Sequence, residues 1–154
     1  MRYIGIVIVA VIMFMNPSAK MVCQDPTLSD LAAQVDMTEE EFIFISSVVE
    51  AESDRSDDIE GRVMIAITIL NRVQSDQFPD TIEDVLTQRG QFSTVCNGHS
   101  IVDRTELSDQ AVLEAVRMIE DGEAPAVMYF NCIGFFSWAP PYGYVGGNYF
   151  SLEL

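Results

Sequence analysis

The stretch that decides the fold is TEEEFIFISSVVEAE, residues 38–52. Its large apolar side chains recur with the three- and four-residue spacing of a helix that buries one face: Phe42, Ile45, Val48 and Val49. Thr38 followed by Glu41 has the pattern of a capping box, so the helix is predicted to begin there. The sequence therefore predicts a helix over residues 38–52 that packs one face against a core.

The next position on this apolar face is Glu52, a carboxylate where the spacing calls for a hydrophobic residue. Glu50 lies about 200° away round the helix, at ~100° per residue, and is expected to face away. Burial and the negative end of the helix dipole both disfavour ionisation of Glu52. A carboxyl group that stays protonated near neutral pH suits a general acid. The alternative is a helix that ends at Val49 and leaves Glu52 solvated.

Composition limits the classes of function. The 154 residues are enough for one domain, and the 49% hydrophobic content is enough for a real core. The formal net charge of −16 excludes non-specific binding to nucleic acid and fits an anionic membrane surface poorly. The single histidine, His99, argues against histidine-rich metal sites and against Ser-His or Cys-His catalysis. We expect no metal and no cofactor.

The N-terminus has the pattern of an export signal. Arg2 is followed by an uncharged apolar run over residues 4–15, which is short for a transmembrane helix. We predict a signal peptide over residues 1–19. The alternative is an uncleaved anchor that associates with the membrane through residues 4–15. Either way the chain is expected to be exported, as a secreted, periplasmic or cell-envelope protein.

An exported chain is able to form disulfides, and this one has Cys23, Cys96 and Cys132. At most one intramolecular pair is available. Cys96 with Cys132 is the more natural pair because both lie within the predicted folded body. Unpaired buried cysteines are the alternative.

The remaining patterns predict a helical body followed by a small β and loop part, hence an α+β, mainly α fold. A lead-in segment, residues 20–37, carries a short helix over residues 28–35, and the main domain spans residues 38–154. Further helices are predicted over residues 59–75 (apolar nearly all round, so buried and central), 81–86 and 108–120, the last capped by Ser108. Residues 126–131 read as a strand, and an aromatic segment with prolines and glycines follows.

Several motifs occur in a fixed order along the chain. They are VVEAE (residues 48–52), EGRV (60–63), ILNRV (69–73), FPDTI (78–82), GQFS (90–93) and YFN (129–131). Together they resemble the cell-wall hydrolase family of the spore cortex-lytic (SleB/CwlJ) type. The resemblance covers residues 44–151, and the ordered set is more specific than any single motif.

The resemblance implies a lysozyme-like, lytic-transglycosylase-like domain that cleaves peptidoglycan glycan strands with one catalytic glutamate. Carried over, that glutamate is Glu52, with Glu50 as the alternate. Glu52 would protonate the glycosidic oxygen and then, as a base, assist attack by the muramic 6-hydroxyl to give a 1,6-anhydro product. Hydrolysis would need a second carboxylate. The candidates lie in the acidic loop, where solvated acids are the alternative: Asp54, Asp57, Asp58 and Glu60.

The resemblance also suggests substrate-binding residues. Gln91 would bond a sugar, Phe92 would stack on a sugar or enter the core, and Ser93 would contact substrate or form a turn. On the strand, Tyr129 and Asn131 share one face and are candidates to contact the glycan.

Further candidates for the wall of the groove lie in the segment with prolines and glycines: Tyr142, Tyr144 and Trp138. Asn71 is assigned a supporting role near the site, as Glu50 and Glu60 are. The alternative is that Asn71 and Arg72 cap their helix and brace the acidic loop. Asn148 departs from the family pattern, because many relatives have a histidine there.

The leading hypothesis is thus an exported enzyme whose partner is the peptidoglycan glycan strand, with no obligate protein partner evident. The first alternative is a catalytically inactive peptidoglycan-binding or interaction module on the same scaffold. The second is a small exported inhibitor that shares only the fold.

Overall fold

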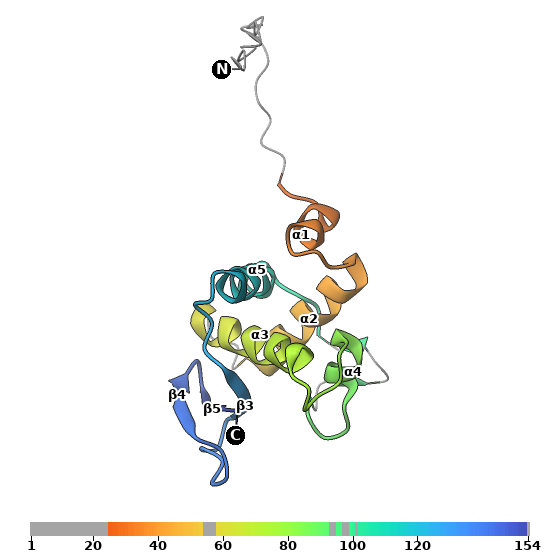
Figure 1. Cartoon of the computed structure of the whole chain (residues 1–154). Helices are drawn as coiled ribbons and strands as arrows, with labels where there is room; N and C mark the ends of the chain where they lie inside the picture. Colours follow the sequence, from red (N-terminus) through yellow and green to blue (C-terminus); the bar gives the residue numbers. More distant parts are fainter. Residues whose placement is uncertain (1–24, 54–57, 93–94, 97–98, 101, 154) are drawn as a thin grey trace, which may run out of the picture.

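The computed structural model describes residues 25–53, 58–92, 95–96, 99–100 and 102–153. Helices and a small sheet follow one another as the sequence predicts (Figure 1). The elements are α1 (Leu28–Gln34), α2 (Glu39–Glu52), α3 (Ile59–Gln74), α4 (Ile82–Thr87), β1 (Val95–Cys96), β2 (His99–Ser100), α5 (Glu106–Glu120), β3 (Val127–Asn131), β4 (Pro141–Val145) and β5 (Asn148–Leu152). The expected α+β, mainly helical class is confirmed.

The α3 helix is the centre of the molecule. Every residue from Gly61 to Leu70 is buried, as its nearly all-round apolar sequence predicts. Figure 1 shows α3 between α5 on one side and the sheet on the other, and it also contacts α2 and α4. Each neighbour therefore takes its position from α3.

The α2 helix begins and ends where the sequence predicts. The Thr38 hydroxyl accepts the backbone N–H of Glu41 at 3.2 Å, and the Glu41 carboxylate accepts the N–H of Thr38 at 2.9 Å. Phe42, Ile45, Val48 and Val49 are fully buried. The helix continues to Glu52, so the alternative of an end at Val49 is wrong.

The start of α5 corrects one prediction. Ser108 is not the cap, because the helix begins at Glu106 and Thr105 is its N-cap. The Thr105 hydroxyl accepts the N–H of Ser108, while the Ser108 hydroxyl accepts the N–H of Thr105 at 2.8 Å. Ser108 is thus the reciprocal partner, three residues into the capping box.

The sheet has the strand order β3-β5-β4, with both pairs antiparallel. Phe130 lies opposite Phe150, and these rings face the core. The neighbouring row, Asn131, Tyr149 and Tyr144, runs across the three strands and therefore lies on the other face. The sheet thus has one packed face and one face that carries polar and aromatic side chains.

Two glycines let the sheet approach α3 closely. A Cβ atom placed on Gly61, in the first turn of α3, would lie 2.7 Å from the Cα of Gly146. Gly146 forms the β4–β5 turn with Gly147, and both have positive φ. The turn therefore packs directly on the start of α3.

The predicted pairing of Cys96 with Cys132 is wrong. Cys132 is a free, exposed thiol just after β3. Cys23 and the predicted signal peptide lie outside the described residues. Within the described part of the chain, no helix has the length and apolar character that a membrane span requires.

The glycine contact predicts a graded effect of alanine substitution. Gly146→Ala places a Cβ 2.4 Å from the Cα of Gly61 at a φ of +51°, and we expect it to lower the free energy of unfolding by about 3 kcal/mol. Gly122→Ala is the control, because φ is +71° there but no heavy atom lies within 4 Å. For Gly122→Ala we expect the free energy of unfolding to fall by about 1 kcal/mol. Urea unfolding measures both, and equal losses would contradict the close packing of turn and helix.

Candidate active site

Glu52 is the last residue of α2 and is half-buried. The backbone N–H of Ser53 donates to the carbonyl of Val49 at 3.1 Å, and the Ser53 hydroxyl donates to the carbonyl of Glu50 at 2.8 Å. These bonds close the last turn of the helix. Glu52 is therefore the final residue of a helix whose last turn is closed by hydrogen bonds.

Glu50, the alternate candidate, is bound on both carboxylate oxygens. Arg62 of α3 donates from Nε and Nη2 to the two oxygens, each at 3.1 Å, and the Thr105 hydroxyl donates at 2.7 Å. The Arg62 side chain is 3% exposed and that of Glu50 is 13% exposed. Its place opposite the apolar stripe suggested that Glu50 faces away from the core. In the structure its side chain is instead largely buried against Arg62. It joins α2 to α3 and to the start of α5.

This contact decides between the two glutamates of the Glu-Ala-Glu sequence. The hydrogen bond from Arg62 holds the pKa of Glu50 below its usual range, and the Thr105 hydroxyl adds to the effect against the opposing burial. A carboxylate held ionised by a bidentate arginine cannot act as a general acid near neutral pH. Glu50 is a structural residue, which leaves Glu52 as the acid candidate.

Two carboxylates of the acidic loop are described. Asp58 is the N-cap of α3 and accepts the N–H of Glu60 at 3.0 Å. Glu60 is exposed in the first turn of that helix. Asp54 and Asp57 lie outside the described residues. Within the described residues, no group of three or more His, Cys, Asp or Glu side chains is placed to hold a metal ion.

Asn71 and Arg72 hold β3, and not the acidic loop. Asn71 donates to the carbonyls of Pro125 and Val127 at 2.9 and 3.0 Å. Arg72 donates from Nε to the carbonyl of Met128 at 2.7 Å. The acidic loop joins the opposite end of α3, so the predicted bracing of that loop is wrong.

The Arg72 guanidinium lies among aromatic rings. Its central carbon is 5.0 Å from the ring centre of Phe78, 5.4 Å from that of Phe92 and 5.8 Å from that of Tyr129. Burial lowers the pKa of Arg72 to about 10. Cation–π contacts at these distances stabilise a buried charge, so Arg72 fixes the sheet to the end of α3.

The GQFS motif is divided between surface and core. Gln91 is exposed, and its N–H closes a turn onto the carbonyl of Gln88 at 3.1 Å. Phe92 is 5% exposed and packs against Phe130 with ring centres 6.2 Å apart. The core alternative is therefore correct for Phe92, and its ring has no face open to a sugar. Ser93 lies outside the described residues.

Tyr129 is half-buried in an aromatic cluster. Its ring centre lies 4.8 Å from that of Trp138, 6.1 Å from Phe136 and 6.0 Å from Phe78. Two of these rings come from the segment between β3 and β4, and the third follows α3. The ring of Tyr129 thus packs the β3–β4 connection against Phe78, which follows α3.

Asn131 and Tyr142, the two other candidate substrate-binding residues on the sheet, differ in their environments. Asn131 accepts the N–H of Ile133 at 2.8 Å and so shapes the turn after β3. Tyr142, on β4, is 48% exposed and open to a ligand. Asn148, where many relatives have a histidine, is 5% exposed at the start of β5. A buried asparagine there is part of the sheet and does not face substrate directly.

Arg62 and Thr105 are the functional neighbours that sequence reasoning missed. They lie 12 and 55 residues from Glu50 along the chain, so no helical or strand periodicity connects them. The only signal for Arg62 was a basic residue within a helix that is otherwise apolar nearly all round.

The Glu50 contact predicts a specific loss of stability. Glu50→Gln removes the charge that pairs with buried Arg62, and we expect the free energy of unfolding at pH 7 to fall by about 2 kcal/mol. Because the folded-state pKa of Glu50 is lowered, its contribution is present above pH ~4.5 and is lost as pH falls through the folded-state value. The wild-type advantage over the variant should therefore shrink in acid, as measured by urea unfolding at several pH values.

Glu114→Gln is the matched control, because Glu114 pairs with Arg117 on the exposed side of α5. Exposed pairs contribute little, so this variant should stay close to the wild type. A Glu50→Gln protein as stable as the Glu114→Gln protein would contradict the structural role of Glu50.

Comparisons with known proteins identify the family. The model of the Cell Wall Hydrolase family matches residues 56–142. The spore cortex-lytic enzyme of Oceanobacillus iheyensis is 35% identical over 77 residues, which are 50% of this chain and 28% of that protein. That of Bacillus subtilis is 35% identical over 77 residues, 50% of this chain and 25% of that protein. The chain thus spans about a quarter of the length of these curated relatives.

Two solved structures share the fold. The catalytic domain of the Bacillus cereus SleB protein has a TM-score of 0.62 and 26% identity, covering 74% of this chain and 91% of that one. The catalytic domain of the germination-specific lytic transglycosylase SleB from Bacillus anthracis has the same TM-score and identity, covering 74% and 95%. The resemblance seen in the ordered motifs is confirmed, and this chain belongs to the Cell Wall Hydrolase family.

Proposed function

We propose that the chain cleaves the glycan strands of peptidoglycan as a lytic transglycosylase, with Glu52 as both acid and base. The observation that carries this proposal is the state of Glu50, which Arg62 and Thr105 hold ionised. Glu52 is then the acid candidate of the motif, half-buried at the end of α2. A related catalytic domain bears the name of a lytic transglycosylase.

The chemistry needs one carboxyl group used twice. Protonated Glu52 gives its proton to the glycosidic oxygen as the bond to the muramic anomeric carbon breaks. The resulting carboxylate accepts the proton of the muramic 6-hydroxyl as that oxygen attacks the same carbon. The product is a 1,6-anhydro ring, Glu52 is protonated again, and no water is consumed.

Hydrolysis is the second candidate, and it would require another carboxylate near Glu52. Of the described acids in the loop, Asp58 caps α3 and Glu60 is exposed. Neither arrangement favours the role of a nucleophile or of a base for water. The described residues therefore favour transglycosylation.

The proposal includes export, because the substrate lies outside the cytoplasm. The support is the charged and then apolar pattern of residues 2–15, followed by Asn16 and Pro17. Gln91 and Tyr142 are exposed and are proposed to contact the glycan. A binding module without activity on this scaffold is the alternative that the following experiment tests.

Digestion of purified peptidoglycan tests the reaction directly. We expect the wild-type chain to release fragments with 1,6-anhydromuramic ends, and Glu52→Gln to release none, because an amide cannot transfer the proton. Glu114→Gln is the control and should retain most of the activity, since Glu114 pairs with Arg117 on the exposed side of α5. Mass spectrometry distinguishes anhydro ends from reducing ends. Reducing ends would mean hydrolysis. If neither the wild-type chain nor the control variant releases fragments, the result would favour the inactive binding module.

The charge of the chain predicts a salt dependence. A protein of net charge −16 and an anionic wall repel each other, and salt shortens the range of this repulsion. Raising the ionic strength from about 10 to about 150 mM, which shortens the Debye length from ~30 to ~8 Å, should increase the initial rate of wall clearing. The loss of turbidity at constant pH measures this rate. A maximum at the lowest ionic strength would contradict the electrostatic argument.

A further inference from the structure

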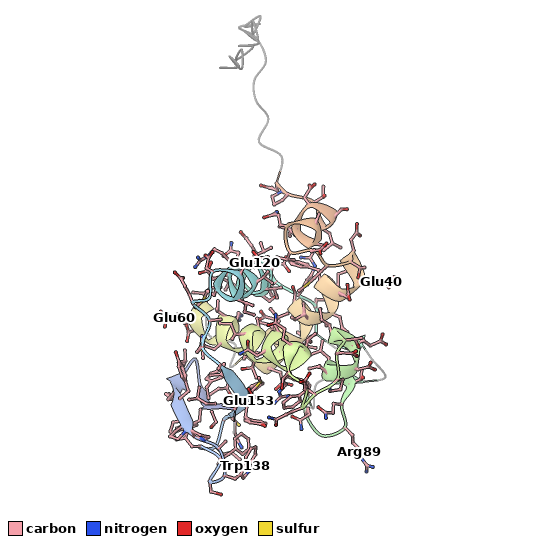
Figure 2. The ribbon with its side chains drawn as sticks, viewed as in Figure 1. Glu40, Glu60, Arg89, Glu120, Trp138 and Glu153 are labelled. Atoms are coloured by element: carbon pink, nitrogen blue, oxygen red, sulfur yellow. The ribbon has the colours of Figure 1, made fainter. Side chains whose placement is uncertain are left out.

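The charge of the chain is unevenly distributed. Residues 124–152 contain no Asp, Glu, Lys, Arg or His, and of the 24 acidic residues only Glu153 lies beyond residue 123. This uncharged segment forms β3, β4, β5 and their connections. Figure 2 shows Trp138 at the sheet end of the molecule, far from Glu40 and Glu120 on the helices. The sheet end of the molecule thus carries few charges, with Glu153 directly after β5 and Asp58 against the β4–β5 turn.

Aromatic side chains cover part of this end. Tyr144 of β4 lies opposite Tyr149 of β5, with ring centres 4.6 Å apart. Phe135, from the segment after β3, packs edge-on against Tyr149 at 5.0 Å. Tyr144 is 61% exposed and Phe135 is 46% exposed. We name these three rings, Phe135, Tyr144 and Tyr149, the aromatic platform.

The platform is held in place before any ligand binds. Tyr149 is fixed in β5 between two hydrogen-bonded strands, and it contacts the rings on either side. Tyrosine and phenylalanine have few rotatable bonds, so binding on such rings costs little conformational entropy. An exposed, ordered group of aromatic rings is typical of a binding surface.

The platform lies close to the candidate acid. Tyr144 and Tyr149 flank the β4–β5 turn, and Gly146 of that turn packs on Gly61 at the start of α3. Asp58, which caps α3, lies against the same turn. Arg62, the next residue after Gly61, binds Glu50 in the last turn of α2. The platform therefore lies beside the contact between the start of α3 and the end of α2.

We propose that the aromatic platform binds the ring face of a sugar in the glycan strand and thereby holds the strand beside Glu52. This inference rests on the proposed function, since it names how that same site holds its substrate. The C–H groups on one face of a pyranose are apolar and carry slight positive charge, which suits the negative face of an aromatic ring. Its hydroxyl groups stay in water.

Charge favours this occupant over two others. A stem peptide bears carboxylates, and the uncharged segment has no cation to bind them. An anionic membrane surface attracts clusters of Lys and Arg, which the segment also lacks. The C–H face of a pyranose ring carries no formal charge, so an aromatic surface without cations suits it.

Binding of the full chain to soluble glycan strands, released from peptidoglycan by an amidase that removes the stem peptides, tests the proposal. All proteins carry Glu52→Gln so that the strands are not cleaved, and binding is measured at about 150 mM salt because the amidase leaves a carboxylate on each muramic residue. We expect Tyr144→Ala to bind about tenfold more weakly, at the upper end of the energy of an aromatic contact. Tyr144→Phe should bind as the parent does, because it keeps the ring face. Ile133→Ala is the matched control, since Ile133 is 87% exposed in the same segment but is not aromatic.

Three results would overturn the proposal. The first is unchanged binding of Tyr144→Ala, with thermal unfolding showing that the variant is folded. The second is a loss in Tyr144→Phe as large as in Tyr144→Ala, which would assign binding to the hydroxyl group. The third is binding that depends on Tyr144 only with vesicles of phosphatidylcholine and not with the glycan.

Together with the digestion by the wild-type chain, this binding experiment separates the proposal from the proposed function. If the chain releases no fragments but Tyr144 still controls binding to the stripped glycan, the platform stands and the cleavage activity does not. If anhydro fragments form and binding is independent of Tyr144, the activity stands and the platform does not.

Discussion

The contact on which the candidate site depends is the bidentate pair of Glu50 with Arg62, completed by the Thr105 hydroxyl. It joins the last turn of α2 to the first turn of α3 and to the cap of α5. Because Arg62 is 3% exposed, its charge would be costly without this carboxylate. Glu50 thus fixes the helix end that carries Glu52, the residue proposed as the acid.

The α3 helix connects this contact to the sheet. Its start holds Glu50 through Arg62 and meets the β4–β5 turn through Gly61. Its end holds β3 through the side chains of Asn71 and Arg72, which donate to three backbone carbonyls. The Arg72 guanidinium also lies among aromatic rings. The sheet is therefore fixed at both ends of one buried helix, which places its aromatic face in a constant position relative to the α2–α3 junction (Figure 1).

The parts that could be predicted from the sequence are local. The spacing of Phe42 to Val49 and the capping box of Thr38 define α2 because both act within a few residues. The partners of Glu50, Asn71 and Arg72 could not be predicted, because they lie 12 to 56 residues away. The sequence could not distinguish Thr105 from Ser108 as the N-cap of α5, because the hydroxyl of either residue suits an N-cap. Only the fold identifies Thr105. Cysteine content alone could not reveal that Cys132 is exposed and unpaired.

The most direct test of the account compares Glu50→Gln and Glu52→Gln in a single experiment that measures both thermal unfolding and the rate of glycan cleavage per folded molecule. The account predicts opposite patterns. Glu52→Gln should have no activity per folded molecule, whereas Glu50→Gln should unfold at a lower temperature than the wild type and cleave the glycan while it remains folded. An inactive Glu50→Gln protein with unchanged stability, beside an active Glu52→Gln protein, would contradict the assignment of the two glutamates.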